Sequence, residues 1–150
     1  MKFSDVIVAV ATLVVVSLLL ESVLLLAFVP AMSHSGIDVA GILSTLVGSL
    51  VVGYLFALKI QEESRIRSVA SIVVLFALVV AFATMAISAN PLASPAIKDA
   101  TNSVFSTSGW TNYDWFDSVF VLVAINIVFA LVFGFIGVYA GSMLKKPKKV

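Results

Sequence analysis

The sequence predicts an all-α integral membrane protein, a bundle of four transmembrane helices with both termini on the cytoplasmic side. Three observations lead to this prediction. The chain is 61% hydrophobic and only 11% charged, whereas an average soluble domain is about 25% charged. Four long apolar segments follow one another, and the basic residues gather on one side of the resulting layout. Little polar sequence remains for a soluble unit, so we expect residues 1–150 to form a single membrane domain.

The first predicted helix covers residues 6–29, a run of valine, leucine, alanine and isoleucine interrupted by Glu21. A helix of about 20 residues crosses the ~30 Å hydrocarbon layer of a bilayer. The run is longer than the apolar region of a secretory signal peptide, which is about 7–15 residues. We therefore interpret it as a retained helix that ends at Pro30, since proline and the small polar residues after it interrupt helices.

The second predicted helix covers residues 37–59 and carries small residues at four-residue steps. These are Gly41, Thr45, Ser49 and Gly53. Residues four apart share a helix face, and in lipid a face of small side chains lets two helix backbones approach closely. We expect this helix to be the centre of packing.

The third and fourth predicted helices cover residues 66–89 and 118–143. Asn90-Pro91 ends the third, because the residue before a proline disfavours helical geometry. The fourth carries a second set of small residues, Gly134, Gly137 and Gly141. We expect the second and fourth helices to pack together through these glycines.

Residues 92–117 form the one long connection and include a possible short helix on the membrane surface. Its aromatic residues Trp110, Tyr113 and Trp115 are of the type that collects where lipid headgroups meet hydrocarbon. We predict that these three side chains anchor the loop at the outer interface, just before the fourth helix.

The basic residues predict the orientation. In a four-span layout eight of the nine fall on one side: Lys2, Lys59, Arg65, Arg67, Lys145, Lys146, Lys148 and Lys149. Only Lys98 falls on the other side. Since cytoplasmic loops carry an excess of lysine and arginine, we expect both termini in the cytoplasm of a cell whose plasma membrane holds the protein.

A layer of polar residues inside the membrane is the main candidate for function. With ~1.5 Å of rise per helical residue, Glu21, Ser44, Thr45 and Asn126 come out at similar depth in three different helices. A carboxylic acid inside a membrane is costly and usually faces other helices or a water-filled cavity. A neutral Glu21 would also be able to donate a hydrogen bond to Asn126 or to a hydroxyl group.

Three roles remain open for Glu21. It can act as polar glue between helices, exchange a proton or bind a cation, or face a partner subunit. We expect the protein to be a small non-catalytic subunit of a larger membrane complex, contacting other subunits or a second copy through its small-residue seams. The alternative is a small proton- or cation-coupled transporter or channel component in which Glu21 is the working acid.

Several other classes of function find no support in the sequence. The chain has no cysteine, and it has no phosphate-binding glycine loop, zinc-protease motif or nucleophile elbow. His34 and Asp38 are too few to hold a metal, which needs three or four ligands. The basic cluster at 145–149 follows a membrane span, so we interpret it as a topology anchor. We therefore expect no enzyme activity, no cofactor and no nucleic-acid partner, with the lipid bilayer as the surrounding partner.

Overall fold

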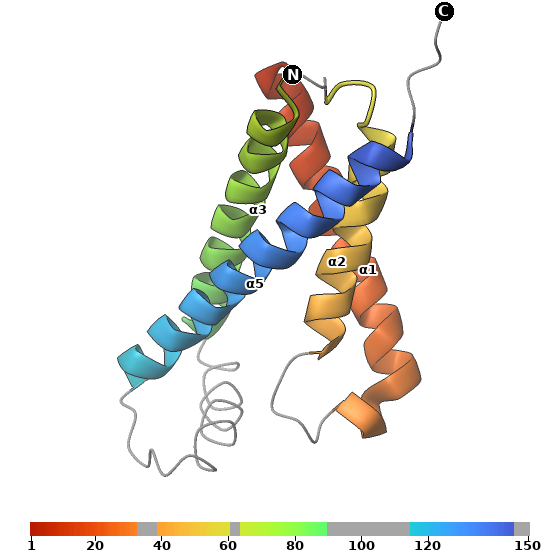
Figure 1. Cartoon of the computed structure of the whole chain (residues 1–150). Coiled ribbons are helices and arrows are strands. Elements are labelled where there is room, and N and C mark those ends of the chain that lie inside the picture. The colour runs from red at the N-terminus through yellow and green to blue at the C-terminus, as the bar shows by residue number, and fades with distance from the viewer. Residues whose placement is uncertain (33–38, 61–63, 90–114, 146–150) are drawn as a thin grey trace, which may run out of the picture.

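The computed structural model describes residues 1–32, 39–60, 64–89 and 115–145, and within these ranges the chain is helical and contains no strand. Four helices are present (Figure 1). They are α1 (Phe3–Met32), α2 (Val39–Leu55), α3 (Arg65–Ser88) and α5 (Trp115–Leu144). The predicted all-α class is thus confirmed for the described part of the chain. The expected surface helix within 92–117 lies largely outside the described residues.

The helix ends differ from the predicted ones by a few residues. α1 continues to Met32, past the proline that we expected to end it. Proline interrupts a single ladder hydrogen bond, and membrane helices tolerate this where neighbouring groups compensate. α5 begins at Trp115, three residues before the predicted start.

α2 is shorter than predicted, with 17 residues instead of the 23 in the range 37–59. After Leu55, three-residue bonds appear among the four-residue bonds of the helix. The amides of Ala57 and Lys59 donate to the carbonyl oxygens of Tyr54 and Phe56, whereas the amides of Phe56 and Ile60 still donate four residues back. Such tightening of the last turn is common where a helix runs out of partners for its carbonyl groups.

Three of the helices contain stretches long and apolar enough to cross a membrane: Phe3–Leu24, Arg65–Ala86 and Val123–Leu144. At most 33% of the residues in any of these stretches are buried inside the protein. Large apolar side chains such as Leu19, Phe82 and Val132 are exposed instead. An apolar surface of this extent suits lipid as its surroundings. α2 is also apolar, but at ~1.5 Å per residue it is only about 25 Å long.

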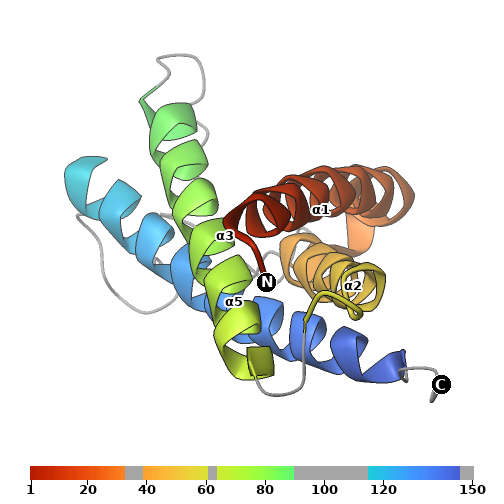
Figure 2. The same cartoon turned by 90° about the horizontal axis from the view of Figure 1, so that it is seen from above.

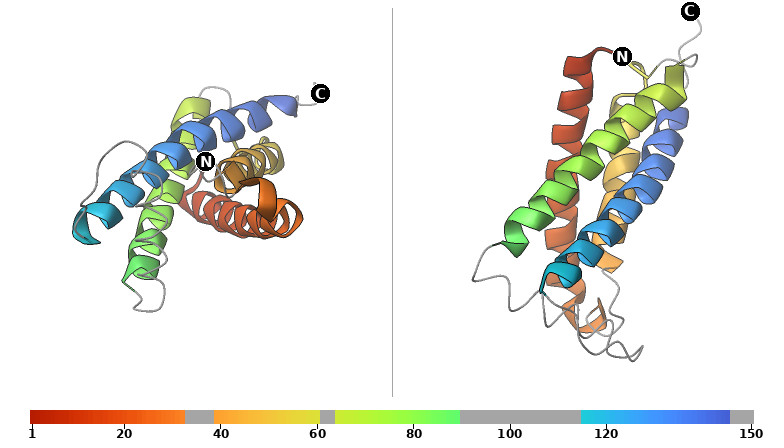
Figure 3. Two further views of the ribbon diagram at one scale, coloured as in Figure 1. Left: turned by 90° about the horizontal axis from the view of Figure 1, so that it is seen from below. Right: turned by 90° about the vertical axis from the view of Figure 1, so that its left-hand side faces the viewer.

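The four helices form a ring in the order α1, α2, α5, α3, in which each described helix contacts its two neighbours (Figure 2). The contact between α2 and α5 is the most extensive. The start of α1 and the end of α5 lie at the same end of the ring, which we call the terminal end (Figure 1). Towards the opposite end, α3 and α5 diverge from α1 and α2 (Figures 1 and 3).

The apolar core lies in the terminal half of the ring. Leu13 of α1, Val52 of α2, Ile72 of α3 and Val138 of α5 are each less than 2% exposed. In the same half, Asp5 near the start of α1 forms an ion pair with Lys59 after α2. Side chains therefore fill the space between the helices in this half. In the other half the helices diverge, and a cavity can form between them.

Glycines on α2 and α5 allow these two helices to approach each other closely. A Cβ atom added at Gly141 would overlap the Leu50 backbone, and one added at Gly53 would overlap the Val138 backbone. A Cβ at Gly137 would lie 2.7 Å from the carbonyl oxygen of Leu46. Contact between backbones replaces the hydrophobic driving force that is missing between helices in lipid.

Candidate functional site

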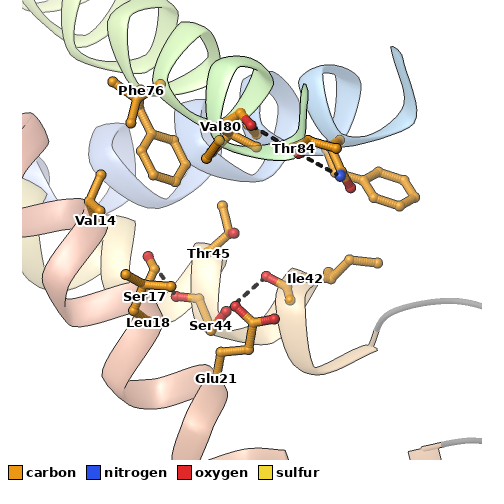
Figure 4. A pocket seen from close by; sticks show the side chains of 16 residues that line it. Val14, Ser17, Leu18, Glu21, Ile42, Ser44, Thr45, Phe76, Val80 and Thr84 are labelled. Carbon is orange, nitrogen blue, oxygen red and sulfur yellow. Dashed lines mark hydrogen bonds between the residues drawn. The ribbon is translucent and has the colours of Figure 1, made fainter. Parts of the chain in front are cut away.

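A cavity of about 330 Å³ lies between the four helices in the diverging half of the ring (Figure 4). Every helix contributes a polar side chain to its wall. These are Ser17 and Glu21 from α1, Ser44 and Thr45 from α2, Thr84 from α3 and Asn126 from α5. The four polar residues singled out by their calculated depth all line this cavity.

The α1 wall of the cavity is set by helical spacing. Four residues of α1 line the cavity and share one helix face, because they are spaced by three, one and three residues. They are Val14, Ser17, Leu18 and Glu21. Glu21 is half-buried, and its side chain is directed toward α2, beside Ser44 (Figure 4). Ser17 is buried, and its hydroxyl donates a long hydrogen bond of 3.4 Å to the Ser44 carbonyl oxygen.

The α2 wall approaches α1 at a glycine. A Cβ atom at Gly48 would lie 2.7 Å from the Ser17 hydroxyl oxygen, so the Ser17 side chain would have to move to admit a larger residue there. One turn earlier, the buried Ser44 hydroxyl donates to the Gly41 carbonyl oxygen at 3.0 Å. Ser44 therefore takes part in two bonds at the boundary between α1 and α2, immediately next to Glu21.

In the opposite wall, a hydrogen bond between two side chains joins α3 to α5. The Thr84 hydroxyl donates to the Val80 carbonyl oxygen at 2.9 Å. Because the Thr84 hydroxyl proton is used in that bond, the hydroxyl oxygen can accept a hydrogen bond from the Asn126 side-chain nitrogen, 3.3 Å away. This bond ties α3 to α5 and fixes which end of the Asn126 amide faces Thr84.

The remaining wall is apolar and includes the rings of Phe76 and Phe129. Glu21 is the one acid that lines the cavity in the described residues, and no lysine, arginine or histidine joins it there. The volume of the cavity is far above the ~10–15 Å³ that is needed to hold one water molecule. With six polar side chains as partners, the cavity can hold water, and Glu21 can then exchange a proton with it or attract a cation.

The other predicted site residues lie elsewhere. Gly41 lines the cavity, and Trp115 is the first residue of α5. Trp110 and Tyr113 lie outside the described residues. The remaining glycines and Ser49 lie at the contacts of α5, away from the cavity: Ser49, Gly53, Gly134, Gly137 and Gly141.

Two polar side chains of the cavity, those of Ser17 and Thr84, were not predicted. For Ser17 a signal exists, since it precedes Glu21 by one helical turn and therefore shares its face. Thr84 is one of several small residues on the third apolar segment, and the sequence does not say which of them turns inward. Its place in the cavity depends on the rotation of α3 about its own axis, which packing decides.

No group of three or more histidine, cysteine, aspartate or glutamate residues that could hold a metal ion occurs in the described part of the chain. Comparison with protein-family models, with curated proteins and with solved structures finds no match to this chain. The functional proposal therefore depends on the geometry of the cavity.

Proposed function

We propose that all four helices cross the membrane and that both termini lie in the cytoplasm. Three helices are long and apolar enough to cross the membrane. The remaining helix, α2, runs beside α1 (Figure 1). Residues 56–60 lengthen the α2 segment beyond its 17 helical residues. The basic residues Lys2, Lys59 and Arg65 adjoin helix ends that lie together at the terminal end, where the positive-inside rule would place the cytoplasm.

Within that arrangement, we propose that the protein binds a proton or a small cation at Glu21 and works as a transporter or channel component. One observation carries this proposal: polar side chains from all four helices converge on a single cavity that contains one acid. Acids placed in this way inside a membrane commonly mark ion or proton pathways. Polar glue between two helices would require neither a cavity nor contributions from all four.

A role as a non-catalytic subunit of a larger complex remains the second candidate. We expected the small-residue seams to contact neighbouring subunits, but Gly53, Gly137 and Gly141 pack within the chain. A neighbouring subunit would therefore have to bind to the outer apolar faces of the helices. Those faces suit lipid equally well, so the cavity favours the transport role.

The test is ion uptake by the purified full-length protein in lipid vesicles. We expect vesicles with the wild-type protein to take up protons or monovalent cations faster than empty vesicles when an opposing ion gradient drives the flux. Glu21→Gln should reduce uptake to the level of empty vesicles, because glutamine keeps the hydrogen-bonding shape without the exchangeable acid. Glu21→Asp should retain part of it.

The matched control is Ser22→Ala, which changes the next residue of α1. Ser22 is exposed, and its hydroxyl bonds to its own helix at the Leu18 carbonyl oxygen. This variant should transport like the wild type. Equal uptake by wild-type and Glu21→Gln vesicles would contradict the transport role, and constant co-purification with other polypeptides would favour the subunit role.

A further inference from the structure

Two open apolar grooves flank α3 in the terminal half of the protein, on the outside of the ring. The first groove, about 370 Å³, lies between α3 and α1 and is lined by Phe3, Val6 and Leu78, among others. The second groove, about 410 Å³, lies between α3 and α5 and is lined by Leu131, Val132 and Phe135, among others. Neither groove belongs to the Glu21 cavity.

The two grooves meet on α3. Ala70 and Val74 line both of them, and Val74 is 51% exposed, so it forms a low ridge between the two. Neither side chain is long enough to separate the grooves completely. The two grooves are therefore continuous and form one branched apolar surface, with Ala70 and Val74 of α3 at the branch point. We call it the forked surface.

Among the described residues that line the first groove, one is basic, and it lies at the terminal end of the protein. This residue, Arg67, is exposed, in the first turn of α3. Asp5, the acid in the first turn of α1, is already paired with Lys59. Guanidinium groups bind phosphate oxygens with two parallel hydrogen bonds, which makes arginine well suited to a phosphate headgroup.

The length of the first groove matches one leaflet of a bilayer. It runs along α3 from Arg67 to Leu78, about 16 Å at ~1.5 Å per residue. That length is about half of the ~30 Å hydrocarbon layer. An acyl chain that begins at the headgroup level beside Arg67 would therefore end near the bilayer centre.

We propose that this surface is a binding site for one anionic two-chain phospholipid of the leaflet at the terminal end. Its two chains occupy the two grooves on either side of Val74, and its phosphate contacts Arg67. The proposal rests on the membrane placement proposed above, and it is independent of any proton or cation chemistry at Glu21. A phospholipid is the occupant that supplies both a forked apolar body and a negative head at this spacing.

The test is native mass spectrometry of the full-length protein in mild detergent, with phosphatidylglycerol or phosphatidylcholine of the same acyl chains added. We expect wild-type protein to bind phosphatidylglycerol about tenfold more tightly, because the choline cation of phosphatidylcholine offsets the charge of the phosphate that Arg67 contacts. Arg67→Gln should remove this difference. Val74→Trp, which fills the fork, should weaken the binding of both lipids.

Two variants serve as controls. Lys2→Gln removes an exposed charge at the same end without touching either groove, and Val128→Trp adds the same bulk at an exposed position of α5 outside them. Both should bind lipid like the wild type. Glu21→Gln should also keep the lipid preference, so failure of the ion-transport proposal would leave this result unchanged.

Equal binding of the two lipids by the wild type would overturn the proposal, as would an Arg67→Gln variant indistinguishable from Lys2→Gln. A third outcome would also overturn it. If Val74→Trp converts a dimer of the wild-type protein into a monomer, the forked surface is an interface between two copies of the chain.

Discussion

At the scale of single residues, the same substitution has different consequences at neighbouring glycines of α5. The effect of a glycine-to-alanine substitution on stability depends on which atom the new methyl group would contact. At Gly141 that atom belongs to the Leu50 backbone, which cannot move without displacing α2. At Gly134 it is a terminal methyl group of Val73, 3.3 Å away, at the end of a side chain.

We therefore expect Gly141→Ala to lower the free energy of unfolding by about 1–3 kcal/mol, the usual cost of overpacking. The measurement is a denaturation titration of the protein in detergent micelles. Gly134→Ala is the matched control and should change stability by less than half as much. Equal effects at the two positions would mean that α2 and α5 do not approach each other as closely as described.

The bond between Thr84 and Asn126 is the second prediction at this scale. Thr84→Val keeps the shape of the side chain and removes both of its hydrogen bonds. Interhelical hydrogen bonds in membranes average ~0.6 kcal/mol, so we expect a loss of about that size in the same titration. Thr84→Ser keeps the hydroxyl and should recover most of it. If Thr84→Val is as stable as the wild type, this bond does not hold α3 to α5.

At the scale of helices, the sequence predicted where each element lies but not where it ends. The four apolar runs of the sequence located all four described helices, and three of these are long and apolar enough to cross a membrane. The ends depend on local hydrogen bonds that hydrophobicity does not report. Thus α1 continues past Pro30, and α2 gives way after Leu55 to turns with mixed three- and four-residue bonds.

The short α2 makes its crossing of the membrane a specific prediction. The chain contains no cysteine, so single cysteines report position without background. We expect Met32→Cys, at the end of α1, to react with a membrane-impermeant maleimide in intact cells. Leu58→Cys, an exposed position after α2, should react only after the cells are opened. Reaction of both in intact cells would place the ends of α2 on one side of the membrane.

At the scale of the whole molecule, the sequence predicted a layer of polar residues but not the rotation of each helix about its axis. The rise per residue placed Glu21, Ser44, Thr45 and Asn126 in one layer, and all four line the cavity. The arithmetic could not show that the helices diverge around this layer, because divergence follows from close packing of glycines in one half of α2 and α5. Thr84 was missed for the same reason, since its inward direction is a property of the assembled ring.

In the proposed transport role, Glu21 faces water in the cavity and exchanges a proton there. Infrared spectra of the protein in bilayers, recorded over a pH titration and after transfer to heavy water, test it most directly. Subtracting the spectra of Glu21→Gln isolates the Glu21 carboxyl band, with Glu62→Gln as a control that should leave this band in place. We expect a carboxyl band that grows as the pH falls and shifts in heavy water. A Glu21 signal that stays the same at every pH and does not exchange with heavy water would show that Glu21 exchanges no proton with water in the cavity.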